Sequence, residues 1–405
     1  MRRVAVTGMG VVSCIGNDLA SVAESLKAGR SGITAAPEYA QLGFRSQVWG
    51  RPEADTAAID KRLLRFMGDG AAWAYLAALE AIENAGLSAT EVASPKTALI
   101  AGSGGPSTAA QVAAADTARE KGPRRVGPFA VPKCMCSTLS ANLATALKIQ
   151  GPSYSISSAC ATSGHCIANA ADLVRLGRAD VALAGGGEEL DWALSVLFDA
   201  MGALSCGYND RPAAASRPYD ANRDGFVIAG GAGMLVLEDM DRARARGARV
   251  YAELLGHGAT SDGADMVAPS GEGAVRCMRQ ALSGIDPARV TYINTHGTST
   301  PAGDITELTA IKEVFGERVP PLSSTKSLTG HSLGATSAQE AVFSILMMTE
   351  GFISPSVGIE TLDDGAAGAP IVTERRDGVA HDVVLSNSFG FGGTNCTLAF
   401  GRGEG

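Results

Sequence analysis

The stretch SYSISSACATSG, residues 153–164, decides the fold of this chain. Its alternating start is typical of a β-strand, and small residues follow before a helix begins. Apolar residues then recur at helical spacing from Ile167 to Val174, and Gly177 marks the end of that helix. A strand that runs through a tight turn into a helix is the basic unit of α/β proteins.

The same rhythm runs through the whole chain. Short apolar runs predict strands at 4–7, 97–101, 153–157, 181–184, 234–238, 292–294 and 383–386. Helical patterns cover 69–85, 162–176, 306–314 and 337–349. Strands that alternate with helices predict parallel βαβ units and an α/β fold.

Two halves of similar design are expected. The segment 242–249 closes one strand–helix series before a new strand at 250–255, and each half ends in a strand followed by a glycine-rich return. We therefore divide the chain into an N-terminal half, 1–245, and a C-terminal half, 246–405.

Composition excludes several classes of protein. Of 405 residues 45% are hydrophobic, which supports a large core, and the net charge of −8 argues against a nucleic-acid binder. No window approaches the ~18 continuous apolar residues of a membrane span, and no signal peptide is evident. Eight cysteines without Cys-x-x-Cys spacing predict neither a disulfide scaffold nor a metal site. We expect a soluble, cytoplasmic protein.

Cys160 is the candidate nucleophile. It sits at the strand-to-helix turn, where unpaired amides and the helix dipole lower the pKa of a thiol, so a thiolate is expected near neutral pH. Most cysteines in proteins are small, buried hydrophobic residues, and we expect this role for the other seven cysteines. From spacing alone, both readings of Cys160 stay open.

Two histidines in loops are candidate catalytic groups. His296 directly follows a predicted strand, and His331 directly precedes a predicted helix. Two imidazoles aimed at one carbonyl oxygen would stabilise the enolate left by a departing carbon dioxide. Lys326 is expected to have a structural and electrostatic role, with Glu307 as its ion-pair partner.

Glycine-rich loops complete the pattern. In SNSFGFGGTN, residues 386–395, glycines flank Phe391 and let the ring swing beside a reacting centre. A phosphate cradle is disfavoured, because the segment leads into a strand rather than a helix. The runs at 102–105 and 185–187 are expected to be tight turns near the cavity.

Four motifs in order, SACATS, HGTST, Lys-x-x-x-Gly-His and GFGGTN, resemble the β-ketoacyl-acyl-carrier-protein synthases of the thiolase superfamily. The resemblance covers essentially the whole chain and is closest to the synthase I branch. It implies a five-layered αβαβα thiolase fold with two pseudo-equivalent halves. It also implies a homodimer in which the strand before Cys160 pairs across the two-fold axis.

The resemblance implies an acyltransferase that condenses malonyl-carrier protein with an acyl chain held on Cys160, in fatty acid elongation. His296 and His331 would assist decarboxylation, and Lys326 and Glu307 would match the family's lysine and its partner. The amides of Cys160 and Phe391 would form the oxyanion hole, and the Phe391 ring would be the gate. Thr298 and Thr300 would bind the phosphopantetheine arm, and no cofactor is implied.

Basic side chains fit an acidic carrier protein as the partner. They form the clusters Lys61, Arg62 and Arg65, and Arg124 and Arg125, with Arg45 as a further candidate; solvated surface charge is the alternative for each. Pro106, Gly164 and the run at 134–138 depart from the synthase I pattern and leave the chain-length preference open.

Three other functions share some of these features. Thiolases use a second cysteine where this chain keeps both histidines. A specialised polyketide or aryl-polyene ketosynthase stays an alternative. A non-catalytic chain-length partner would lack the nucleophile, which is present here.

Overall fold

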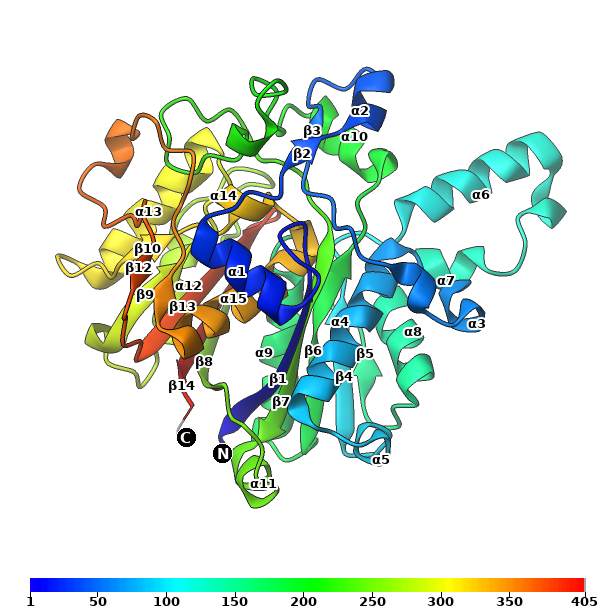
Figure 1. Ribbon diagram of the computed structural model, residues 1–405, viewed down its shortest axis with the longest axis horizontal. Helices are drawn as coiled ribbons and strands as arrows, with labels where there is room; N and C mark the ends of the chain where they lie inside the picture. The colour runs from blue at the N-terminus through cyan, green and yellow to red at the C-terminus, as the bar shows by residue number, and fades with distance from the viewer. Residues whose placement is uncertain (404–405) are drawn as a thin grey trace.

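The computed structural model describes residues 1–403, and its main feature is a ten-stranded mixed sheet (Figure 1). The first half of the chain contributes β1 (Val4–Val12), β4 (Thr97–Gly102), β5 (Ser153–Tyr154), β6 (Val181–Glu188) and β7 (Gly231–Asp239). The second half contributes β8 (Ala252–Ser261), β9 (Val290–Asn294), β10 (Leu322–Ser323), β13 (Val383–Gly390) and β14 (Thr394–Arg402).

The two halves have the same strand order. In the first it is β5-β4-β6-β7-β1 and in the second β10-β9-β13-β14-β8, which is third, second, fourth, fifth, first in both. The halves meet where β1 pairs with β8 at Ala5 and Val6. This repeated topology is the duplication that the glycine-rich returns suggested, although the boundary at residue 245 stays a prediction.

The prediction of purely parallel βαβ units is wrong in part. β4 is parallel to β5 and β6, and β9 is parallel to β10 and β13. However, β7 is antiparallel to both β1 and β6, and β14 is antiparallel to both β13 and β8. The fifth strand of each half therefore returns as an antiparallel neighbour, which hydrophobic periodicity cannot reveal.

Two helices form the middle layer of the fold. α9 (Thr162–Arg175) packs on β6 and β4 and also reaches β14, whereas α15 (Thr336–Glu350) packs on both β7 and β13. Every residue of α15 from Thr336 to Met348 is buried. A helix that is buried all round has protein on every side, as expected between two sheets.

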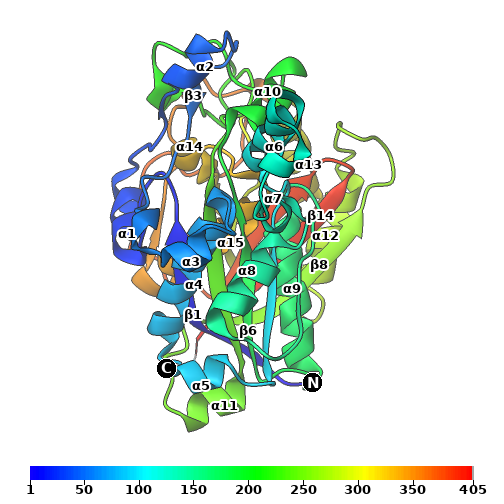
Figure 2. The ribbon, with the colours of Figure 1, turned by 90° about the vertical axis from the view of Figure 1, so that its right-hand side faces the viewer.

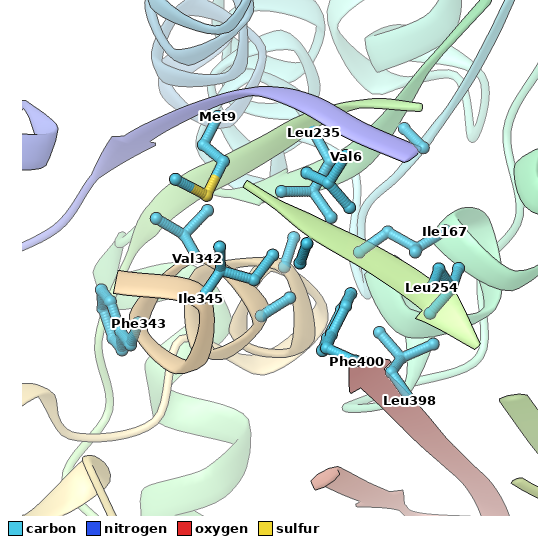
Figure 3. Close-up of a cluster of buried hydrophobic side chains, with 14 of the residues drawn as sticks. Val6, Met9, Ile167, Leu235, Leu254, Val342, Phe343, Ile345, Leu398 and Phe400 are labelled. Carbon is cyan, nitrogen blue, oxygen red and sulfur yellow. The ribbon is translucent and has the colours of Figure 1, made fainter. Parts of the chain in front are cut away.

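Figure 3 shows the core around this middle layer. Val342 and Ile345 of α15 meet Met9 and Leu235 on one side, and Phe400 lies on the other; all are at most 1% exposed. Burying a side chain of this size contributes roughly 1.5–3 kcal/mol. The core thus holds α15 between strands of the two halves of the sheet.

Outer helices cover the sheets. α4 (Asp69–Ala85), which matches its predicted range, packs on β1, β6 and β7 beside α8 (Thr138–Leu147). α12 (Glu272–Ala281) packs on β8 and β14 and against α13 (Pro301–Phe315). The remaining elements are α1 (Leu19–Ala28), β2 (Thr34–Ala35), α2 (Pro37–Gln41), β3 (Val48–Trp49), α3 (Lys61–Leu64), α5 (Ala89–Val92), α6 (Thr108–Lys121), α7 (Ala130–Cys134), α10 (Trp192–Ala200), α11 (Met240–Ala245), α14 (Lys326–Thr329), β11 (Phe352–Ile353) and β12 (Arg376–Asp377). The two five-stranded halves of the sheet thus lie on either side of α9 and α15, and outer helices cover each half, which makes the expected five layers.

The glycine run at 185–187 is not a turn, contrary to the prediction. It lies within β6, where a Cβ at Gly185 would meet the Gly233 oxygen at 2.0 Å and one at Gly187 would meet the Gly70 oxygen at 2.3 Å. These glycines allow neighbouring backbones to approach β6.

Among residues 1–403, no helix combines the length and the low polarity that crossing a membrane requires.

Candidate active site

Cys160 lies just before α9 and points toward two imidazoles. Its Sγ is 3.0 Å from Nε2 of His331, and the sulfur and one ring nitrogen of each of His296 and His331 lie within 4.8 Å of one another. The two imidazole rings are 5.3 Å apart and nearly perpendicular. Three segments distant in the sequence therefore meet at one point.

The ends of the middle helices hold this geometry. Ser337 Oγ, in the first turn of α15, donates to the Cys160 carbonyl at 3.1 Å, and the Ala338 amide donates to Ser163 Oγ at 2.9 Å. His331 lies between α14 and α15, where its amide donates to the Val227 carbonyl and its Nδ1 contacts Thr336 Oγ1 at 3.1 Å. The nucleophile and this imidazole are thus attached to the same buried layer.

Glu307 is a backbone anchor rather than the ion-pair partner of Lys326. Its carboxylate accepts the amides of His296 and Gly297, both at 2.8 Å, and the side-chain amide of Asn387 at 3.1 Å. It therefore fixes the loop that carries His296.

Lys326 pairs with Glu340, so the predicted pairing with Glu307 is wrong. Lys326 Nζ lies 2.7 and 2.8 Å from the two carboxylate oxygens of Glu340, and both side chains are buried. Glu307 was expected to be the partner because it follows the His296 loop in the sequence. Its carboxylate instead accepts hydrogen bonds from the backbone amides of that loop. A carboxylate within the apolar helix α15 was the signal for Glu340, because a buried charge needs a partner.

The electrostatics of the thiol are opposite to the prediction. Burial raises the pKa of Cys160 to about 12, although the charge of Lys326 and the amides of Phe391 and Cys160 act to lower it. The expectation of a resting thiolate, based on the helix end alone, is therefore wrong, because it omitted desolvation.

Both imidazoles are neutral. Burial, together with the positive charge of Lys326, holds the pKa of His296 and His331 well below 6.5. A neutral His331 in contact with a thiol can accept its proton when the nucleophile is needed.

One cavity of about 470 Å³ unites the predicted catalytic and phosphopantetheine-binding residues other than Lys326, which does not line it. Cys160, His296, His331, Glu307, Thr298, Thr300 and Phe391 all line it. Thr298 and Thr300 face each other with hydroxyl oxygens 3.1 Å apart. The cavity thus leads from a pair of threonines to the thiol.

Phe391 lies in a tight hairpin between β13 and β14. Gly392 and Gly393 have φ values of 82° and 69°, which other residues rarely adopt, and a Cβ at Gly390 would come within 3.0 Å of the Cys160 amide nitrogen. The Phe391 ring is 37% exposed and lies 6.4 Å from that of Phe198, which also lines the cavity. The predicted continuation into a strand is confirmed, but the loop is shorter than predicted, because β13 extends to Gly390 and β14 begins at Thr394.

Two polar networks were missed by the sequence reasoning. The buried Glu188 accepts the amides of Gly104 and Gly334 at 2.7 and 2.8 Å, which joins two loops beside the site. Arg223 donates to the Thr300 carbonyl at 3.1 Å and pairs with the buried Asp304 at 3.2 Å. The feature of the sequence that could have predicted these two networks is an acidic residue at the end of a strand or a helix.

The basic residues do not form one patch. Arg65 lies over the rings of Phe66 and Phe129, which brings α3 close to the segment that follows Arg124 and Arg125. Arg45 instead pairs with Asp199 of α10, away from α3 (Figure 1).

Gly164 is explained by packing in the core. A Cβ there would meet Cys396 Sγ at 2.9 Å and Ser337 Cβ at 3.2 Å. We predict that Gly164→Ala lowers the free energy of unfolding by about 1–2 kcal/mol, because overpacking outweighs the gain in helix propensity. Urea unfolding of Gly164→Ala, Cys396→Ala and the double variant measures the coupling. Additive effects would contradict the proposed contact.

Comparisons with known proteins agree with this site. Residues 1–243 match the family model of the β-ketoacyl synthase N-terminal domain, and residues 251–360 match that of the C-terminal domain. The 3-oxoacyl-[acyl-carrier-protein] synthase 1 of Escherichia coli K12 is 57% identical over 401 residues, which cover 98% of each chain.

Solved structures give the same result. A β-ketoacyl synthase from Burkholderia phymatum STM815 superimposes with a TM-score of 0.94 at 33% identity and covers 100% of both chains. One chain in the structure of a type II PKS acyl-carrier protein in complex with its ketosynthase superimposes with a TM-score of 0.90 at 30% identity, again over 100% of both chains.

Proposed function

This chain belongs to the β-ketoacyl synthase family, and we propose that Cys160, His296 and His331 are its catalytic residues. Its activity is that of a β-ketoacyl-acyl-carrier-protein synthase in fatty acid elongation, an acyltransferase. The observation that carries the residue assignment is the approach of one sulfur and two imidazole nitrogens to within 4.8 Å of one another in the cavity.

In the first half-reaction the Cys160 sulfur attacks the thioester carbonyl of the acyl donor. His331, 3.0 Å away, accepts the thiol proton. The amides of Cys160 and Phe391, which both interact with the sulfur, stabilise the oxyanion. The carrier thiol leaves with a proton, and the acyl chain remains on Cys160.

In the second half-reaction the malonyl thioester loses carbon dioxide. The electrons of the broken bond form an enolate, whose oxygen accepts hydrogen bonds from His296 and His331. The enolate carbon attacks the acyl carbonyl on Cys160, the sulfur leaves as a thiolate, and this thiolate takes up one proton from solvent to restore the resting thiol. Burial and, second to it, the positive charge of Lys326 lower the pKa of both imidazoles and favour their uncharged form.

Acyl transfer to Cys160 is the direct test. The intact protein is incubated with carrier-bound acyl chains of varied length and unsaturation, and the modified peptide is identified by mass spectrometry. We expect one acyl group per chain, located on Cys160, with a rate that depends on chain length. Acylation at another cysteine would refute the assignment.

We propose acyl carrier protein as the partner, with phosphopantetheine bound by Thr298 and Thr300 and with no resident cofactor. The support is the cavity geometry and the likeness to a ketosynthase in complex with a carrier protein. The phenyl ring of Phe391 would gate this channel.

The basic cluster on α3 is proposed to steer the carrier protein. We predict that Arg62→Glu with Arg65→Glu raises the KM for carrier-bound substrates while kcat changes little, because the attraction acts on encounter and is screened by salt. The readout is steady-state kinetics at low and high ionic strength, with alkylation of Cys160 expected to be unchanged. Arg375→Glu with Arg376→Glu, at the start of β12 on the other side of the molecule, is the charge-matched control (Figure 1). An unchanged KM would refute the role.

A homodimer is proposed from the free edge of the sheet. β5 is an end strand with both residues exposed, and unpaired strand edges invite pairing. α8 packs on β5, α7 packs on α8, and α6 packs on α7; neither α6 nor α7 has a buried residue, and Val131 and Tyr154 are 73% and 39% exposed. These helices share one face with α8 (Figure 2). A partner chain on this face would cover these apolar side chains.

We also propose a cytoplasmic location. All eight cysteines lie within the part of the chain that the structure describes, and each is a free thiol. Free thiols persist in reducing compartments.

Of the alternatives, the fatty-acid branch is the better supported. Identity to synthase 1 enzymes reaches 57%, against 30% to the polyketide ketosynthase. The presence of Cys160 beside both histidines argues against a non-catalytic chain-length partner.

A further inference from the structure

The three polar groups at the base of the cavity are also a set of metal ligands. One sulfur and two imidazole nitrogens lie within 4.8 Å of one another, with the cavity above them. Three protein ligands of this kind with an open fourth position are typical of tetrahedral zinc sites. We propose that Cys160, His296 and His331 bind a divalent cation of the zinc class, and that this ion inhibits the enzyme.

Metal binding requires the three ligand atoms to change their separations. Zinc–sulfur and zinc–nitrogen bonds of about 2.3 and 2.0–2.1 Å place tetrahedral ligand atoms roughly 3.3–3.6 Å apart. The 3.0 Å contact between Cys160 and His331 would widen by roughly half an ångström, and the largest separation would shorten by more than that. Nδ1 of His296 has no hydrogen-bond partner among residues 1–403, so turning that ring breaks no bond at this atom.

Surrounding groups support the ligands. His331 Nδ1 contacts Thr336 Oγ1 at 3.1 Å, and such a contact orients a ligating imidazole. Glu307 holds the backbone of the His296 loop through two amides at 2.8 Å. The ligands therefore come from segments that are already fixed.

The charge balance also permits a cation. Lys326 would repel it, but Lys326 Nζ is 2.7 Å from the carboxylate of Glu340 in a buried ion pair. On binding, the Cys160 proton leaves to solvent and the sulfur becomes an anionic ligand. Sulfur and imidazole ligands favour zinc over magnesium and calcium, which prefer oxygen.

Binding would remove the nucleophile and both imidazoles at once. The Cys160 lone pair would be shared with the metal, and neither ring nitrogen could bind the enolate oxygen. Excess acyl-carrier substrate and zinc would therefore compete for the free enzyme.

The experiment uses the full chain after treatment with a chelator. Cobalt(II) is added as a spectroscopic probe, since a cobalt–thiolate bond gives a charge-transfer band in the near ultraviolet, and zinc is then titrated to displace it. We expect one ion per chain. Affinity should fall at least tenfold in Cys160→Ala, His296→Ala and His331→Ala, because even indirect supporting groups are worth 10–100-fold. The exposed-thiol variants Cys136→Ala and Cys206→Ala are matched controls and should bind as the native chain does.

Absence of the band in the native chain would overturn the site, as would its persistence in Cys160→Ala or its loss in Cys206→Ala. Full affinity in both histidine variants would reduce the site to a single thiol and overturn the three-ligand assignment. Zinc binding without loss of condensation would overturn the inhibition. Because the band is read without substrate, this result is independent of the proposed catalytic roles.

Discussion

Replacing Cys160 with alanine is expected to abolish condensation, with a loss on the order of 10⁴-fold or more, as when the nucleophile of a covalent mechanism is removed. The acyl chain would have no point of attachment. The readout is the formation of 3-oxoacyl-carrier protein, together with the absence of an acyl adduct by mass spectrometry. Decarboxylation of the malonyl thioester should continue in this variant, because both imidazoles remain in place.

Cys166→Ala is the matched control. Cys166 lies in the same helix, α9, and is fully buried, so its loss affects packing but no reacting atom. Urea unfolding of both variants separates stability from chemistry. If Cys160→Ala lost no more activity than Cys166→Ala, the nucleophile would have to be sought elsewhere.

Replacing either histidine with alanine is expected to slow decarboxylation by about 10²-fold or more, or roughly 2.7–4 kcal/mol of transition-state stabilisation. Each imidazole supplies one donor to the enolate oxygen in a desolvated site. The two variants should differ in the first half-reaction. His331→Ala should also slow acyl transfer to Cys160, because its Nε2 is 3.0 Å from the sulfur. His296→Ala should affect mainly decarboxylation.

His257→Ala is the control for the loss of an imidazole. His257 pairs with Asp172 at 3.0 Å and does not line the cavity. The measurements are carbon dioxide release from malonyl-carrier protein and single-turnover acylation. Equal, small effects for all three histidine variants would contradict the assignment.

The ion-pair partner of Lys326, which is Glu340 and not Glu307, could not be predicted from the sequence. The sequence indicated Glu307 as the partner of Lys326 because Glu307 lies on the first helix after the His296 loop. In the structure the donors nearest Glu307 are backbone amides, and the buried charge of Lys326 is matched by Glu340. Which carboxylate meets which cation is a long-range property of packing.

The sequence by itself determined the local elements and the chemistry. Residue periodicity placed α4 at Asp69–Ala85 and the helix after Cys160, and four motifs indicated Cys160, His296 and His331 together with the five-layered fold. These features depend on neighbours along the chain, where spacing and residue type carry the information.

Only the tertiary structure decided which strands pair antiparallel, that Gly185 lies inside β6, and that Glu340 neutralises Lys326. It also reversed the expected pKa shift of Cys160, because the helix end is visible in the sequence while the loss of solvent around the sulfur is not. Strand pairing, ion pairing, close backbone contacts and the desolvation of the sulfur all depend on residues distant along the chain. They form only when the two halves pack on α9 and α15.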